Sequence, residues 1–169
     1  GDVETVPLSP AGTAATATST FEAQPGTTTP AISVPADVQP ASLADAARQG
    51  DALALFEIGA RYSEGRGVTA NPPEAAVWYK LSADRGFAPA QYRLANLYEK
   101  GTGVAPDAAK AIEYYRKAAS QGNASAMHNL AVMYASGATG TPDLTVAVNW
   151  FRQAADLGVS DSKFNLAII

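Results

Sequence analysis

The chain has 169 residues, with 16 acidic and 12 basic side chains, one histidine and no cysteine. A net charge of −4 argues against the basic surface that neutralises nucleic-acid phosphates, and it disfavours anionic membrane surfaces. The absence of cysteine excludes disulfides, thiolate catalysis and thiolate metal sites. No apolar run approaches the roughly 20 residues of a membrane-spanning helix. We therefore expect no nucleic-acid partner and no direct membrane insertion.

The first 40 residues differ in composition from the rest of the chain. They contain six of the 11 prolines, eight threonines, no Lys or Arg, and one aromatic residue, Phe21. Such a segment cannot bury enough apolar surface to offset its ordering entropy. We expect residues 1–40 to be a disordered linker, a flexible spacer after an upstream domain or membrane anchor. Because the sequence starts at Gly1, with neither initiator Met nor signal segment, we expect a fragment or a processed product, the soluble part of a larger, membrane-anchored protein.

Residues 41–169 repeat with a period of 36 residues and without an insertion. The aligned positions include three sets: Gly50, Gly86, Gly122 and Gly158; Ile58, Leu94, Leu130 and Leu166; Tyr62, Tyr98 and Tyr134. Aromatic pairs recur in the same register at Trp78-Tyr79, Tyr114-Tyr115 and Trp150-Phe151. A unit of this size cannot bury its apolar face alone, so neighbouring units must stack into a solenoid.

Each unit reads as two helices. In the first helix, Ala90, Leu94 and Tyr98 are spaced by four residues and share a face, and Gly101 supplies a left-handed residue that ends it. The second helix begins near a proline, which fits a first helical turn. A short helix over Leu43 to Gln49 fits the second helix of a partial unit. The sequence predicts an all-α solenoid of about three full repeats plus partial end units, truncated within a fourth, with further repeats in the parent protein.

The residues from Ala90 to Val104, followed by those from Ala111 to Gly122, resemble the Sel1-like repeat (SLR), a relative of the tetratricopeptide repeat (TPR). The resemblance covers residues 41–169. It implies a right-handed superhelix of helix-turn-helix units whose concave surface binds a partner protein or peptide, and many bacterial members work in the cell envelope. The third unit departs from the pattern at Ala138-Thr139-Gly140, which leaves the conformation of that turn open.

A Pro/Thr/Ala-rich segment leading into neutral SLR units is also similar to the periplasmic region of PodJ-type polar localisation factors. This narrower resemblance implies a periplasmic location, a role in polar localisation or morphogenesis, and a neighbouring peptidoglycan-binding module. The cytoplasmic coiled coil and the membrane span of those proteins do not occur in the sequence.

Residues suited to catalysis are scarce. His128 is the sole histidine, and its repeat position is elsewhere held by Phe56, Tyr92 and Phe164, so we interpret it as a packing or groove-lining ring. The Gly-x-Gly pairs lack the remaining residues of a phosphate-binding loop and recur at helix ends, which makes them turns. We expect no catalytic residue, no cofactor and no metal site.

The resemblance implies that the first helix of each unit lines the concave face. The candidate groove residues are Phe56, Tyr92, Arg93, Asn96, His128, Asn129 and Phe164. A second interpretation, in which these are ordinary contacts between repeats and solvated side chains, stays open.

Two functions fit the sequence. The first is a non-catalytic interaction scaffold that holds a partner protein or peptide, because solenoids display side chains over an extended surface. The alternative is a module that binds cell-wall glycan, which would require exposed rings at Trp78 or Trp150. Packing of the aromatic pairs against alanines predicts one buried ring in each pair and one partly exposed ring.

Overall fold

The computed structural model describes residues 31–168, and these form eight helices and no strand. The helices are α1 (Ala41–Arg48), α2 (Ala52–Glu64), α3 (Pro72–Ala83), α4 (Ala88–Lys100), α5 (Ala108–Ser120), α6 (Ala124–Ser136), α7 (Leu144–Asp156) and α8 (Ser160–Ile168). The all-α prediction is confirmed, and the short helix expected over Leu43 to Gln49 is α1. The disorder predicted for residues 1–30 lies outside the described residues.

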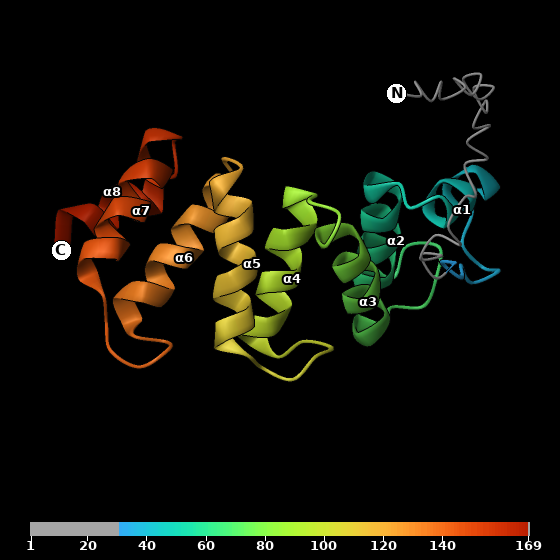
Figure 1. Ribbon diagram of the computed structural model, residues 1–169, viewed down its shortest axis with the longest axis horizontal. Coiled ribbons are helices and arrows are strands. Elements are labelled where there is room, and N and C mark those ends of the chain that lie inside the picture. The colour runs from blue at the N-terminus through green and yellow to red at the C-terminus, as the bar shows by residue number, and fades with distance from the viewer. Residues whose placement is uncertain (1–30, 169) are drawn as a thin grey trace, which may run out of the picture. The chain divides into compact units, whose positions relative to one another are not determined.

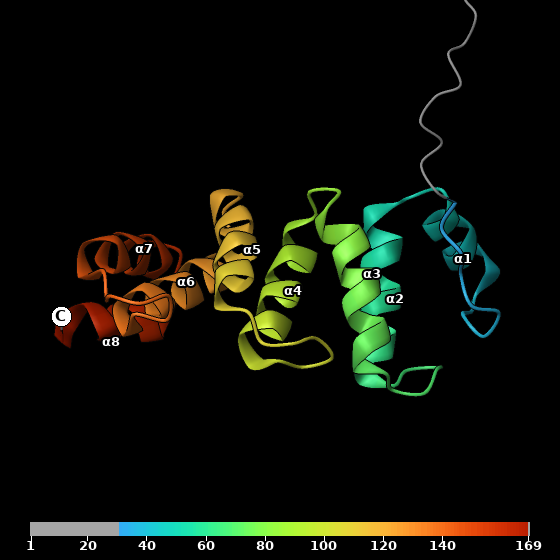
Figure 2. The same ribbon diagram turned by 60° about the horizontal axis from the view of Figure 1, so that its bottom comes forward.

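The helices pack in sequential pairs, α2 with α3, α4 with α5 and α6 with α7, and each pair contacts the next (Figures 1 and 2). By repeat register, α2, α4, α6 and α8 are first helices, which we call A helices, and α1, α3, α5 and α7 are second helices, which we call B helices. The predicted solenoid is therefore the architecture of the described part of the chain.

Local sequence sets the helix ends. Asp107 caps α5, because its side chain accepts a hydrogen bond from the backbone N–H of Lys110 at 3.0 Å. Gly101 ends α4 with a φ of 68°, and a Cβ there would lie 2.4 Å from Pro106. In the third unit, the second glycine of the turn is shifted by one residue to Gly140, which has a φ of 132°, whereas Gly103 in the second unit has a φ of 74°.

The core repeats with the sequence. Ile58, Leu94 and Leu130 are almost fully buried, and alanines surround them. Each such side chain contributes about 1.5–3 kcal/mol through its removal from water. At the second position of each aromatic pair, Tyr79, Tyr115 and Phe151 are at most 2% exposed.

The prediction of one partly exposed ring in each aromatic pair is wrong for two of the three pairs. Trp78 is 2% exposed and donates its indole N–H to Glu74 at 3.0 Å, so its polar atom is satisfied in the interior. Tyr114 is 6% exposed, stacks on Tyr98 and donates its hydroxyl to Asp84 at 2.9 Å. Only Trp150 remains half-buried among these described rings.

Side-chain amides tie the first unit to the second. Buried Gln91 on α4 donates to the carbonyl of Ala83 at the end of α3, at 3.2 Å. Gln121, at the end of α5, donates to Oε1 of Gln91 and to the carbonyl of Gly86, both at 2.9 Å. We call this set the amide clamp. It fixes the end of one unit against both helices of the next.

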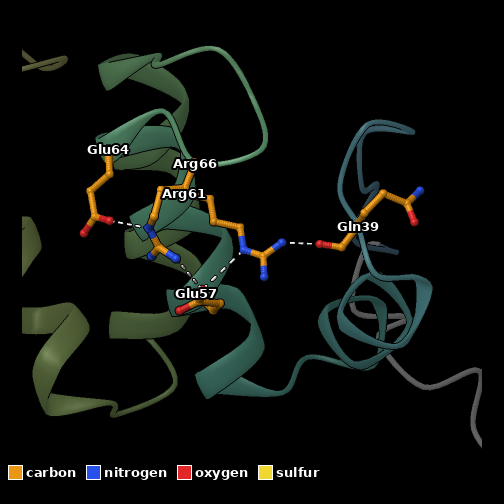
Figure 3. Close-up of polar contacts among 5 residues, drawn as sticks. All are labelled: Gln39, Glu57, Arg61, Glu64 and Arg66. Atoms are coloured by element: carbon orange, nitrogen blue, oxygen red, sulfur yellow. Dashed lines mark hydrogen bonds and ion pairs between the residues drawn. The ribbon is translucent and has the colours of Figure 1, made fainter.

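Ordered structure begins before the boundary predicted at residue 40. Val38 is 4% exposed, and Ile32 and Val34 pack against the core. Arg61 on α2 donates to the carbonyl of Gln39 and also pairs with Glu57 at 3.3 Å (Figure 3). Residues 31–40 are thus held by apolar burial and by one charge-assisted hydrogen bond. None of the helices within residues 31–168 combines the length and the apolarity that crossing a membrane demands.

Candidate interaction surface

The A helices leave a strip of side chains at least partly accessible. On α4 the strip holds Arg93, Asn96 and Lys100, at positions i, i+3 and i+7 of one face. On α6 the same positions hold Asn129, Val132 and Ser136. Nδ2 of Asn129 lies 3.3 Å from Oδ1 of Asn96, so the two strips are adjacent. We call this surface, formed by the two strips, the A face.

A polar network joins the two strips. The hydroxyl of Tyr115 on α5 contacts Oδ1 of Asn96 at 2.5 Å and the carboxylate of Glu99, both on α4. Nδ2 of Asn129 on α6 donates to the same hydroxyl at 3.3 Å. A phenol has a single proton, and the charged Glu99 is the stronger acceptor. The network therefore holds amide groups of two successive units in fixed orientations.

Burial raises the pKa of the Tyr115 phenol well above its ordinary value, and the hydrogen bond to Glu99 raises this pKa further. The phenol consequently remains a hydrogen-bond donor at neutral pH. In the preceding unit, burial raises the pKa of Tyr79, and the positive charge of Arg93 opposes that increase. Arg93 is thus close enough to Tyr79 for its charge to act on the boundary between the first two units.

The predicted ring positions pack between the two helices of their own unit. The ring of Phe56 lies 5.6 Å from that of Tyr79, and the ring of Tyr92 lies 6.1 Å from that of Tyr115. All of these A-helix rings are half-buried. They serve as contacts between helices and retain one accessible edge.

His128 follows the same pattern. Its ring lies edge-on to Phe151 at 5.6 Å, and Nδ1 lies 2.6 Å from the hydroxyl of buried Ser162. No carboxylate within residues 31–168 hydrogen-bonds to this ring, so the histidine and serine lack the acid of a catalytic triad there. This part of the chain also contains no cluster of potential metal ligands.

The structure brings together two of the seven predicted groove residues, Asn96 and Asn129, by direct hydrogen bonding. Arg93 is exposed one turn before Asn96, and it makes no ion pair with the described residues. Phe56, Tyr92 and His128 lie in three separate units, each against a ring of its own B helix. The side chain of Phe164 lies outside the described part of the structure. Whether these residues bind a partner remains a prediction.

Sequence reasoning missed Glu99 and assigned Tyr115 to packing alone. A signal was present, because the equivalents of Glu99 are Ser63 and Ala135, and those of Asn96 are Ala60 and Val132. The repeat thus folds with small or aliphatic side chains at both positions. Polar residues that break a repeat pattern on an accessible face indicate a role other than stacking.

The fold and the A face define a helical-repeat protein with an extended, non-enclosed surface. The Sel1 repeat pattern matches residues 52–87, 88–123 and 124–159, and the chain therefore belongs to the Sel1 repeat family. Proteins of this family are generally interaction scaffolds, and their folds are typically non-catalytic. A comparison with curated proteins gives no significant match.

Solved structures support the family assignment. A protective antigen of uropathogenic Escherichia coli with an SLR fold is 34% identical, with a TM-score of 0.72 over 74% of this chain and 27% of the antigen. A Sel1 repeat protein of Oxalobacter formigenes is 33% identical, with a TM-score of 0.67 over 72% of this chain and 50% of that protein. The chain therefore spans about a quarter and a half of these relatives.

The cysteine-rich protein B of Helicobacter pylori shares the fold at 23% identity, with a TM-score of 0.58 over 74% of this chain and 95% of that protein. Agreement with three SLR proteins confirms the fold class that the 36-residue period predicts. This agreement extends to the SLR solenoid and not to any particular ligand.

Proposed function

We propose that this chain is a scaffold module that binds an extended peptide segment of a partner protein on the A face. The observation that carries the proposal is the network of Asn96, Glu99, Tyr115 and Asn129. Amide, carboxylate and phenol groups match the donors and acceptors of a peptide backbone. Fixing them in advance lowers the entropy lost on binding.

The charges of the A face favour a partner segment that carries an acidic side chain. Arg93 is exposed and makes no ion pair with the described residues, whereas Glu99 is engaged by Tyr115. A carboxylate beside Arg93 would gain a charge-assisted hydrogen bond. The accessible Val132, on the next A helix, offers an apolar contact on the same A face.

A peptide-display library selected on the immobilised chain tests this function. We expect selected peptides to lose at least about tenfold in affinity, or 1.4 kcal/mol, for the double variant Asn96→Ala, Asn129→Ala. Asn149→Ala, at an exposed position on α7, is the matched control and should bind normally. Peptides that bind the double variant and the unaltered chain equally would remove the A face as the binding surface.

A cell-wall glycan is the second candidate ligand. Trp78 is too deeply buried to present a ring to a sugar, and half-buried Trp150 is the remaining tryptophan. Soluble peptidoglycan fragments can be titrated against the chain while tryptophan fluorescence is followed. A saturable response that is lost on Trp150→Ala, with helix content unchanged, would favour glycan over peptide.

We propose a place in the bacterial cell envelope, in the periplasm, with a role in polar localisation or morphogenesis. Support comes from the Pro/Thr-rich composition ahead of the solenoid and from the resemblance of that arrangement to periplasmic SLR regions. Protease added to intact cells and to spheroplasts, followed by detection with an antibody to the chain, tests this location. Protection in spheroplasts would contradict it.

A further inference from the structure

Within residues 31–168, helix α1 is a B helix without an A helix of its own unit. In the complete units, the A-helix pattern reads Ala54, Ile58 and Tyr62, or its equivalents. The positions 36 residues earlier hold Thr18, Glu22 and Gly26, which do not continue the pattern. Within the described residues, α1 packs on α2 and stands at the end of the row of helices in Figures 1 and 2.

The complete units show what an A helix contributes at this place. Each inserts one ring, from Phe56, Tyr92 or His128, against the ring that its own B helix carries. In the first and third complete units the inserted ring also touches the next A helix or the residue that precedes it. Phe56 lies 5.4 Å from Phe87, and His128 lies 2.6 Å from Ser162.

At the first boundary the corresponding place is a hollow of about 380 Å³. Its lining residues are Leu43, Ala46, Asp51, Leu53, Ala54 and Glu57. In the 36-residue register, Leu43 is equivalent to Tyr79 and Phe151. Asp51 is equivalent to Phe87, and Ala54 is equivalent to Ser162. Three of the six lining residues are therefore the equivalents of residues that hold an A-helix ring elsewhere in the molecule.

We propose that this hollow is a docking site for an aromatic side chain carried on an amphipathic helix of a partner protein. The helix takes the place of an A helix beside α1, which the described residues do not provide, so the site continues the interface that the chain repeats internally. Leu53, which is 63% exposed, becomes covered by the docked helix. The site is separate from the A face between α4 and α6, so either can exist without the other.

The charge of the hollow further specifies the partner. Both polar residues in the lining are acidic, and no basic residue lines it. Asp51 caps α2, and Glu57 is engaged by Arg61 and Arg66 (Figure 3). These residues repel a carboxylate placed beside the ring and tolerate a basic residue there. The partner helix therefore carries an aromatic residue and a basic residue about one turn apart.

A peptide with the sequence of α2, Ala52–Glu64, serves as the probe because it presents Phe56 in the manner of an A helix, followed by Arg61. A lactam staple on its polar face keeps it helical, since isolated helices of this length are marginal in water. It is titrated into the full chain while methyl NMR signals are followed. We expect saturable shifts at the methyl groups of Leu43 and Leu53, and at least about tenfold weaker binding of the probe with Phe56→Ala.

Two variants of the full chain separate the hollow from general apolar adhesion. Leu53→Ser should weaken probe binding about five- to tenfold, because the contact covers an exposed leucine. Leu157→Ser removes a leucine of similar exposure, 57%, at the end of α7, and should leave probe binding unchanged. Both changes are at exposed positions, and circular dichroism checks that helix content is kept.

The proposal is overturned if the methyl groups of Leu43 and Leu53 do not shift saturably, or if both probes bind equally well. Equal weakening by Leu53→Ser and Leu157→Ser also overturns it. Two other possible occupants of the hollow would each give a different experimental result. Self-association of the chain that Leu53→Ser abolishes would assign the hollow to a second copy. A tenfold gain in probe affinity on Phe21→Ala would assign it to the chain's own N-terminal segment.

Discussion

The boundary between the second and third units and the boundary after the third unit use the same repeat positions with different chemistry. The first has Asn96, Glu99 and Tyr115, and the Tyr115 hydroxyl donates to Glu99 and lies 2.5 Å from Oδ1 of Asn96. The second has Val132, Ala135 and Phe151 at the equivalent positions. Both carry a buried ring and a buried leucine. The comparison teaches that the buried rings and leucines, which we call the apolar frame, stack the units. The side chains at the accessible positions can differ from unit to unit.

The largest expected effect on stability comes from truncating one buried leucine of the apolar frame in each region. Leu94→Ala and Leu130→Ala should each lower the free energy of unfolding by about 2–5 kcal/mol, because each leaves a cavity in a fully buried site. Urea unfolding followed by circular dichroism measures both. If one variant were nearly neutral, the two regions would not share a common frame.

Removing one hydroxyl tests the polar region alone. Tyr115→Phe copies the ring found at Phe151, and it should lower the free energy of unfolding by about 1 kcal/mol, since Glu99 and Asn129 lose a partner but keep access to water. Peptide binding to the A face should weaken as well. A variant as stable as the unaltered chain, with unchanged peptide affinity, would show that the network serves neither purpose.

A pH titration tests the boundary between the first and second units, where Tyr114 on α5 donates to Asp84. Burial, with the hydrogen bond to Asp84, raises the pKa of Tyr114 from 10.0 to about 12, whereas the third unit has Trp150 at this position. The folded state holds this proton more tightly than the unfolded state, so its contribution is complete below pH 10 and is lost as the pH rises through 12.

Urea unfolding between pH 9 and 12 checks this dependence. Stability should fall over that range, and Tyr114→Phe should make the fall shallower. Tyr62, Tyr79 and Tyr115 also have raised pKa values and retain part of the slope. An identical slope in the variant would mean that Tyr114 does not contribute.

The smallest expected effect comes from transplanting the polar chemistry. The double variant Val132→Asn, Phe151→Tyr copies two members of the network into the third unit. Because Val132 is 38% exposed and the ring of Phe151 is conserved in size, we expect stability to change by no more than about 1 kcal/mol. A loss of several kcal/mol in the free energy of unfolding, measured with urea, would show that packing of the apolar frame depends on the residues at these two positions.

The repeat made most of the fold predictable. A period of 36 residues, spacings of four and recurring glycines located α2 to α7, because these signals are local in the chain. The burial of Trp78 and Tyr114 was not predictable in this way. It depends on Glu74, Tyr98 and Asp84 as partners, and two of these belong to other helices.

The sequence contains a signal for the start of the ordered region, although composition alone does not show it. Ile32 is 36 residues before Val68 and 72 before Val104, so the second half of a unit already begins there. The composition of residues 1–40 obscured this alignment. The candidate site was only partly predictable, because periodicity identifies a helix face but does not reveal that Tyr115 connects Asn96 to Asn129 across a unit boundary.

The amide clamp of Gln91 and Gln121 has a mechanical consequence. At the following boundary, Met127 and Leu157 occupy these positions, and their side chains cannot form directional bonds. The clamp therefore ties α3, α4 and α5 together by directional hydrogen bonds, whereas the equivalent place where α5, α6 and α7 meet has apolar side chains instead. A tethered partner that pulls on the first two units would therefore load these three hydrogen bonds, which hold the two units in one relative geometry.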